Sequence, residues 1–227
     1  MRRQTRQVRV GKLLVGGGAP VSVQTMCNVD PHDAKACLDQ LLSCAALGCD
    51  VFRMTVPDLE AAKVLGEVKK GSPIPIVADI HFDYRLAVEA AVRGADKIRI
   101  NPGNVGSAEN VHKVADACRA AGVPIRIGIN GGSLEKPIEE RYGFSAEAMV
   151  QSAMGHIRLL EEVGFEDICL SLKSSDPAMT VEANRLMAQR CDYSLHIGVT
   201  EAGSRRMGII KNAEALGALL PEGIGDT

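Results

Sequence analysis

Five segments of the chain alternate between apolar and polar residues, which is the pattern of a β-strand with two different faces. They span residues 76–81, 97–101, 125–130, 168–173 and 195–201. In each segment one set of alternate positions is almost all Ile, Leu or Val, while the other carries polar or charged side chains. Parallel strands covered by helices on both faces are instead continuously apolar. We therefore expect one face of the sheet to pack under helices and the other to line a polar space.

The predicted strands recur along the chain with helical segments between them. They begin near Val21, Val51, Ile74, Ile98, Ile125, Ile168 and Leu195, at spacings of 30, 23, 24, 27, 43 and 27 residues. These spacings match a repeated strand–helix unit of about 30 residues. The pattern predicts an α/β fold of the (β/α)8 TIM-barrel type, whose polar interior opens at the carboxyl ends of the strands.

Helix boundaries carry their own signals. Asp30-Pro31 and Asp176-Pro177 each pair a capping residue with a proline suited to the first turn. Ser107 and Ser145 are expected to cap helices over residues 108–121 and 146–163. Glycines expected to end helices in a left-handed conformation stand before the next strands. They are Gly48, Gly71, Gly94, Gly122 and Gly164.

The two ends of the chain and one long connection complete the predicted barrel. Residues 8–18 predict a small hairpin that closes the end opposite the carboxyl ends of the strands. Residues 131–143 predict an extended loop after the fifth strand. Only seven strand–helix units can be counted, and residues 223–227 resemble the lead-in to an eighth strand. Because a seven-stranded barrel would leave two open edges, we interpret residues 1–227 as one incomplete barrel domain.

Composition excludes several functional classes. The net charge is −2 and there is no Trp, so neither bulk attraction nor a stacking platform for nucleic acid is expected. No apolar run approaches the roughly 20 residues of a membrane span, and no secretory signal is visible, so a cytoplasmic location is expected. The seven cysteines are odd in number and include no C-x-x-C pair. This argues against a disulfide framework and against a self-contained zinc or iron–sulfur motif.

Four cations provide the strongest chemical signal. Arg53, Arg99, Arg126 and Lys173 each lie near the carboxyl end of a different predicted strand and can point into one cavity. Buried unpaired cations are costly, and Asp79 cannot neutralise all four. An anion is therefore expected among them, since Arg offers bidentate contacts to phosphate oxygens.

Two glycine-rich loops at the same edge strengthen this interpretation. Residues 101–106 and 128–133 can each present backbone N–H groups to an anion, and the first leads into a helix N-terminus. Combined with the four cations, they predict a phosphorylated ligand, and a diphosphate in particular.

The remaining candidate residues admit more than one role. Asp79 and His81 could orient a hydroxyl or relay a proton, or Asp79 could balance Arg53 or Arg99; the residues do not distinguish these roles. Glu201 could pair with Lys173 or Arg205, but we favour a role in proton transfer. A metal site is not favoured, because a third ligand is not evident.

The other histidines are given structural roles. His196 is expected in the core with its hydrogen bonds satisfied. We expect His32, His112 and His156 at the surface.

Eight short segments occur in one order over nearly the whole chain. They are Val23–Met26, Val77–Phe82, Arg99–Asn104, Ile125–Asn130, Gly132–Glu135, Ser171–Lys173, Leu195–Gly203 and Gly223–Thr227. Together they resemble the 4-hydroxy-3-methylbut-2-enyl diphosphate synthases, iron–sulfur enzymes of the methylerythritol phosphate route to isoprenoids. Each motif is short, but their joint occurrence is specific.

The resemblance implies both a reaction and roles for residues. It implies a barrel that binds 2-C-methyl-D-erythritol 2,4-cyclodiphosphate, whose ring is opened and dehydroxylated by two-electron reduction to 4-hydroxy-3-methylbut-2-enyl diphosphate. The residues that it implies for the diphosphate are Arg53, Arg99, Arg126 and Lys173. Those implied for the polyol and phosphates are Asp79, His81, Asn101 and Asn130. Thr200 and Glu201 would act at the reacting end, with Glu201 as the proton donor.

The chain departs from the family in one large respect. The family's 4Fe-4S cluster is held by three cysteines and a glutamate of a second domain, which is absent here, and none of the seven cysteines matches those ligands. The family takes electrons from flavodoxin or ferredoxin and acts as a dimer in which one subunit's cluster domain covers the other's barrel. We therefore expect this chain alone to bind the substrate weakly or not at all and to lack reductase activity. Two smaller departures are Cys27, where Thr is more usual, and Asn212, where Ser is common.

Two other functions fit the residues. One is a non-redox barrel, such as a pterin-binding synthase or an aldolase acting on a phosphorylated substrate, with Lys173 as the candidate for a Schiff base. The other is a phosphate-sensing or scaffold protein without catalysis.

Overall fold

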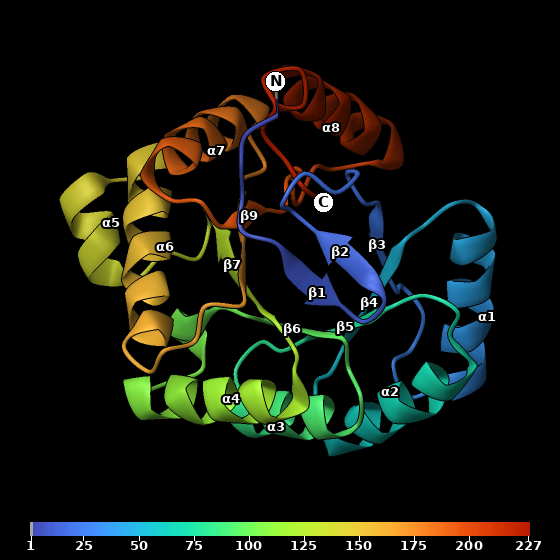
Figure 1. The fold of residues 1–227 in the computed structure, drawn as a ribbon. Coiled ribbons are helices and arrows are strands. Elements are labelled where there is room, and N and C mark those ends of the chain that lie inside the picture. The colour runs from blue at the N-terminus through green and yellow to red at the C-terminus, as the bar shows by residue number, and fades with distance from the viewer. Residues whose placement is uncertain (1) are drawn as a thin grey trace.

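Seven parallel strands, paired in chain order, form a strongly curled sheet in the computed structural model, which describes residues 2–227 (Figure 1). The strands are β3 (Gln24–Met26), β4 (Val51–Thr55), β5 (Ile76–Asp79), β6 (Lys97–Ile100), β7 (Ile125–Asn130), β8 (Ile168–Lys173) and β9 (Ser194–Leu195). Every neighbouring pair is parallel. The predicted TIM-type architecture is thus confirmed.

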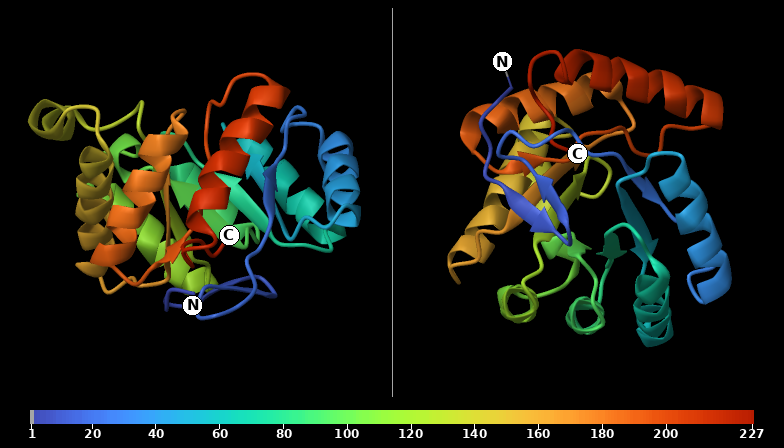
Figure 2. Two further views of the ribbon diagram at one scale, coloured as in Figure 1. Left: turned by 90° about the horizontal axis from the view of Figure 1, so that it is seen from above. Right: turned by 45° about the vertical axis from the view of Figure 1, so that its right-hand side comes forward.

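Helices follow the strands and cover the outside of the sheet (Figures 1 and 2). They are α1 (Ala34–Ala46), α2 (Leu59–Gly71), α3 (Tyr84–Val92), α4 (Ala108–Ala121), α6 (Ala146–Glu161), α7 (Pro177–Arg190) and α8 (Arg205–Leu219). None of the helices within residues 2–227 is long and apolar enough to cross a membrane.

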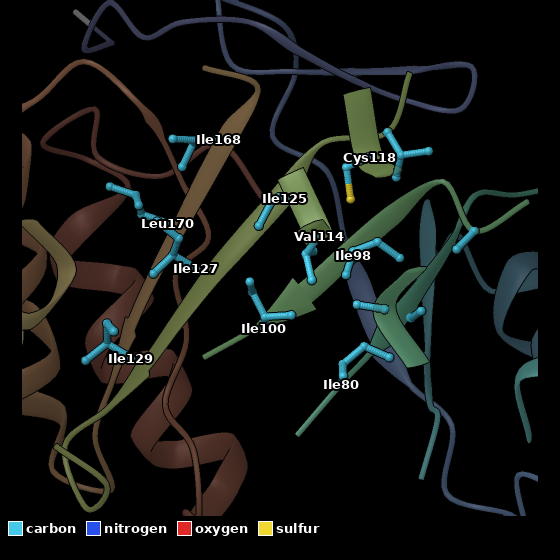
Figure 3. Close-up of a cluster of buried hydrophobic side chains, with 14 of the residues drawn as sticks. Ile80, Ile98, Ile100, Val114, Cys118, Ile125, Ile127, Ile129, Ile168 and Leu170 are labelled. Carbon is cyan, nitrogen blue, oxygen red and sulfur yellow. The ribbon is translucent and has the colours of Figure 1, made fainter. Parts of the chain in front are cut away.

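The apolar side chains at alternate positions of the strands form the layer between the sheet and the helices. Ile98, Ile100, Ile125 and Ile127 are fully buried in it, beside Val114 of α4 (Figure 3). Burying such a side chain contributes about 1.5–3 kcal/mol. Because these apolar side chains pack under the helices, the polar side chains at the other alternate positions point toward the barrel axis.

Several helix boundaries agree with the prediction. The side chains of Ser107, Ser145 and Asp176 accept a hydrogen bond from the backbone N–H groups of the first turns of α4, α6 and α7. Four of the five glycines predicted to end helices have positive φ, namely Gly48, Gly94, Gly122 and Gly164.

Three boundaries differ from the prediction. The α1 cap is Asp33, not Asp30, because the Asp30 carboxylate accepts hydrogen bonds from the backbone and ring of His32. Gly71 is the last residue of α2 and is not left-handed. A Cβ there would lie 2.9 Å from Leu38 of α1, so close helix packing explains this glycine. Helix α6 ends at Glu161, two residues earlier than predicted.

The hairpin of β1 (Val8–Val10) and β2 (Leu13–Val15) covers the amino-terminal end of the sheet, as predicted (Figure 1). Its three buried valines are Val8, Val10 and Val15. Gly11 at its turn lies against Asp96, which precedes β6, and Gly16 lies against Ser194 at the start of β9. The carboxyl ends of the strands therefore form the free end of the barrel.

Two predicted segments differ in kind. The strand predicted over 195–201 is limited to Ser194–Leu195, and beyond it the backbone N–H of Val199 donates to the side chain of Asn212. Within residues 2–227 no regular strand pairs with the outer side of β9, so the alternating sequence does not extend this strand. The predicted loop 131–143 contains the short helix α5 (Lys136–Tyr142), with Pro137 in its first turn.

The sheet edges β3 and β9 are bridged by the last residues of the chain. The Asp226 N–H donates to Leu195 O at 2.8 Å, and Ser22 N–H donates to Asp226 O at 3.2 Å. The buried Asp226 carboxylate accepts from Leu195 N at 2.9 Å and pairs with Arg2 at 3.1 Å. Residue 226 thus occupies the position expected for the start of an eighth strand.

We predict that Asp226→Ala lowers the free energy of unfolding by about 2–3 kcal/mol, because it removes charge-assisted hydrogen bonds from a buried site. Asp226→Asn retains an acceptor for Leu195 N–H and is expected to lose less. Urea unfolding followed by circular dichroism measures both. Equal stability of Asp226→Ala and the parent would contradict a bridging role.

Candidate functional site

A cavity of about 280 Å³ opens at the carboxyl ends of the strands. Its walls come from β4, β6, β7 and β8 and from the loops that follow β5, β6, β7 and β9. The lining residues are Arg53, His81, Arg99, Asn101, Asn104, Arg126, Asn130, Ser133, Ser171, Lys173, Thr200 and Glu201. Nine of the ten predicted site residues are in this set, and the tenth, Asp79, is paired with Arg53 and Arg99 of the wall.

Asp79 is the anionic centre of the site. Its fully buried carboxylate lies 2.6 Å from Arg53 Nη2, 3.1 Å from Arg99 Nη1 and 3.5 Å from His81 Nε2. Burial would raise the pKa of Asp79, but the charges of Arg53 and Arg99 outweigh it and hold the pKa below its usual value. Asp79 therefore balances both arginines. A proton relay through His81 stays a prediction.

Arg126 and Lys173 have no carboxylate partner among the ion pairs of residues 2–227. Arg126 is 1% exposed and donates Nη1 to Ser171 Oγ at 3.0 Å, while its Nε and Nη2 find no protein partner. Burial, followed by the charges of Arg126 and Arg53, lowers the pKa of Lys173 well below its usual value. The site thus has a strong local excess of positive charge.

A fifth cation, Lys97, was missed by the sequence analysis. It lies on the inward parity of β6, two residues before Arg99, and is fully buried with no hydrogen-bond partner for Nζ within the described chain. Burial is the main cause that lowers the pKa of Lys97 to about 8. Its shared parity with Arg99 was the signal that could have identified it.

We predict that Lys97→Met raises the free energy of unfolding by about 2 kcal/mol, because it removes a buried charge without a partner. The folded-state pKa of about 8 lies below the usual 10.5, so the unfolded chain binds more protons between these pH values. The parent therefore gains stability as pH rises from 8 to 10.5, and the advantage of the variant shrinks.

Urea unfolding at pH 7 and pH 10 measures both effects. Lys113→Met, at an exposed lysine of α4, is the control and should leave stability nearly unchanged at either pH. A Lys97→Met variant less stable than the parent would show that the ammonium group is satisfied in the folded state.

Gly128 leaves room for the guanidinium of Arg99. Arg99 packs its guanidinium over this β7 residue, and a Cβ there would lie 2.9 Å from Arg99 Nη2. Arg99 also donates Nη2 to Gly128 O at 3.3 Å. The glycine of the predicted phosphate loop therefore accommodates a cation side chain.

The two loops of the rim are joined by a partly buried contact that the sequence analysis missed. Glu135 after β7 pairs with His156 of α6 and also lies against the position of Gly103 in the loop after β6. Burial would raise the pKa of Glu135, but hydrogen bonds from His156, from its own backbone N–H and from Ser152 together lower it to about 2. His156 is 7% exposed, so the predicted surface location was wrong.

The other histidines divide between surface and core. His32 is exposed and bridges Asp30 at 2.9 Å and Asp58 at 3.0 Å. His112 is partly buried. His196 lies in the core as predicted, but its Nδ1 has no partner within residues 2–227, so its hydrogen bonding is not satisfied there.

Thr200 and Glu201 close the rim after β9. Glu201 has φ of 49°, the one positive value at a non-glycine residue within 2–227. It forms no ion pair there with Lys173 or Arg205, so the alternative structural role is not observed. A side chain held in a left-handed backbone conformation is a marker of functional sites.

We predict that Glu201→Gly is more stable than Glu201→Ala by about 1 kcal/mol, because only glycine adopts positive φ without strain. Thermal unfolding of both variants measures the difference. At Glu182, exposed within α7, the order should be reversed, since glycine is the poorer helix former. If Ala were the more stable residue at both positions, the left-handed conformation would be wrong.

The cysteines do not form a cluster site. Within the part of the chain that the structure describes, no group of three His, Cys, Asp or Glu side chains could hold a metal ion. Residues 2–227 therefore do not fit a 4Fe-4S cluster, and any cluster would need ligands from elsewhere.

Comparison with a family model identifies the fold and the family together. The model described as the GcpE TIM-barrel domain matches residues 5–227. The chain belongs to the GcpE family. This result also confirms the resemblance inferred from the eight motifs.

Curated relatives of the GcpE barrel are similar over its whole length. The chain is 56% identical over 228 residues to a protein of Geobacter sulfurreducens and 51% identical over 227 residues to one of Ruminiclostridium cellulolyticum. Both are named 4-hydroxy-3-methylbut-2-en-1-yl diphosphate synthase (flavodoxin). All of this chain is covered, but only 65% and 64% of those relatives.

Solved structures share the fold of the GcpE barrel at low identity. A dihydropteroate synthase of Coxiella burnetii matches with a TM-score of 0.62 at 16% identity, covering 86% of this chain and 78% of that one. The 7,8-dihydropteroate synthase of Vibrio fischeri matches with a TM-score of 0.62 at 13% identity, covering 95% and 86%. At this identity the likeness concerns the fold alone.

Proposed function

We propose that this GcpE barrel binds 2-C-methyl-D-erythritol 2,4-cyclodiphosphate and forms the substrate-binding part of a 4-hydroxy-3-methylbut-2-enyl diphosphate synthase. The observation that supports this most directly is the excess of inward cations over the two carboxylates at the cavity, those of Asp79 and Glu201. Two linked phosphates would supply the negative charge that balances Arg126 and Lys173, which have no carboxylate partner within residues 2–227. The names of the curated relatives support the same substrate class.

The cavity walls suggest how the ligand is oriented. Arg126 and Lys173, on adjacent strands, would hold the phosphates, with Arg53 and Arg99 preset by Asp79. Asn101, Asn130 and His81 stand nearer the rim and offer hydrogen bonds to hydroxyl groups. Phosphate binding would favour the charged form of Lys173.

The reacting end of the substrate would face the loop after β9. Thr200 and Glu201 line the cavity there, and Glu201 has no ion pair within residues 2–227 that would occupy its carboxylate. We assign Glu201 as the proton donor to the departing hydroxyl.

The reduction itself would need groups from outside residues 2–227. A 4Fe-4S cluster would have its ligands in a further domain, with flavodoxin, or alternatively ferredoxin, as the electron donor. The names of the curated relatives include flavodoxin. Those relatives are longer than this chain. A homodimer would bring one subunit's cluster domain over its partner's barrel. We expect no reductase activity from this chain alone.

The non-redox alternative rests on one observation. The pKa of Lys173 is lowered, and a neutral amine of this kind can form a Schiff base. Reduction with borohydride in the presence of a phosphorylated ketone or aldehyde would trap Lys173 covalently if the barrel were an aldolase. We expect no such adduct.

We predict that Arg126→Met weakens binding of the cyclodiphosphate at least about tenfold, since a hydrogen bond to a charged group contributes about 1.5–3 kcal/mol. Because binding to this chain is expected to be weak, ligand-observed NMR titration is the measurement. Arg126 is buried without full hydrogen bonding, so the methionine variant should fold.

Arg158→Met, at an exposed position of α6, is the matched control and should bind like the parent. Equal affinity of the Arg126 variant and the parent would contradict a role of Arg126 in binding the phosphates. Inorganic sulfate competing as well as diphosphate would show a general anion site instead.

A further inference from the structure

Two cysteines outside the cavity lie in contact at the same end of the barrel. Cys27 directly follows β3, and Cys37 is in the first turn of α1. Their sulfur atoms are 3.7 Å apart. Cys27 is partly exposed and Cys37 is fully buried behind it. Neither residue lines the cavity, so the proposed function leaves this pair without a role.

We propose that Cys27 and Cys37 form a reversible thiol oxidation site, in which a peroxide converts the pair to an intramolecular disulfide. The backbones are already fixed, because Cys27 N–H donates to Arg53 O at 2.8 Å and Cys37 N–H donates to Asp33 O at 2.9 Å. Side-chain rotation can bring the sulfurs to the bonding distance of about 2.05 Å. No large backbone movement is then needed.

The different exposure of the two thiols sets the order of the steps. The accessible Cys27 thiolate attacks hydrogen peroxide and becomes a sulfenic acid, with loss of hydroxide that is protonated to water. Cys37 Sγ then attacks Cys27 Sγ, the S–S bond forms, and a second water leaves. Overall the two thiols lose two protons and two electrons, and the peroxide is reduced to two waters.

The environment of Cys37 suits the second step. Burial, and then the neighbouring Cys27, raise the pKa of Cys37 to about 12, so in the resting pair it stays protonated and unreactive. Conversion of Cys27 to a neutral sulfenic acid removes the part of this effect that comes from the Cys27 charge. Cys37 is therefore the second thiol to react, and it loses its proton as it attacks the Cys27 sulfenic acid.

The disulfide would tie the end of β3 to α1 and close the loop of residues 28–36. This loop carries His32, which reaches across to Asp58, the cap of α2. Oxidation would therefore restrain one side of the barrel rim while leaving the cation pocket in place. Disulfides in proteins of reducing compartments are mostly transient ones of this type.

The test uses the full chain of residues 1–227 with hydrogen peroxide, followed by alkylation, tryptic digestion without reduction, and mass spectrometry. Cys27 falls in peptide 13–35 and Cys37 in peptide 36–53, which also contains Cys44 and Cys49. The Cys44→Ser/Cys49→Ser variant therefore leaves Cys37 as the one cysteine in the second peptide. We expect these peptides to be joined in both proteins and separated by dithiothreitol.

Cys37→Ala is the matched variant. We expect loss of the joined peptides, with Cys27 sulfenic acid accumulating and captured by dimedone. The proposal is overturned if the Cys44→Ser/Cys49→Ser variant oxidises at Cys27 without joining the peptides. Joining that occurs only in urea, where the folded contact is lost, would overturn it as well.

Discussion

Uncompensated positive charge inside the barrel is the constraint on which the site depends. Lys97, Arg99 and Arg126 point inward from two adjacent strands, while Asp79 is the carboxylate that pairs with the cluster. Such charges are costly in a low-dielectric interior, and their mutual repulsion adds to the cost. A doubly phosphorylated ligand would relieve both effects, so the arrangement that weakens the free barrel also favours binding.

The barrel holds these charges because its stability comes from elsewhere. The buried Ile, Leu and Val layer under the helices supplies apolar burial independent of the interior (Figure 3). The hairpin packs its own small cluster of valines at the amino-terminal end of the barrel. Replacement of an inward cation by a hydrophobic residue should therefore leave the fold intact, which separates the chemistry of the site from the integrity of the scaffold.

The local pattern predicted elements well where both sides of a strand have regular partners. Residues 125–130 and 168–173 are strands over the predicted ranges, because β7 and β8 pair with each other and with further strands. Residues 195–201 have the same alternation, but β9 is short because no regular strand of the described part of the chain pairs with its outer side. The cap of α1 was misplaced because two aspartates of suitable type, Asp30 and Asp33, stand near its start.

The sequence by itself determined the strand–helix repeat, the inward parity and hence nine of the cavity-lining residues, since these follow from local period and strand direction. Only the tertiary structure decided which charges pair. The contacts of Asp79 with Arg53 and Arg99, of Glu135 with His156, and of Cys27 with Cys37 each join separate elements. Such contacts depend on sheet register, curvature and helix placement, which no single segment encodes.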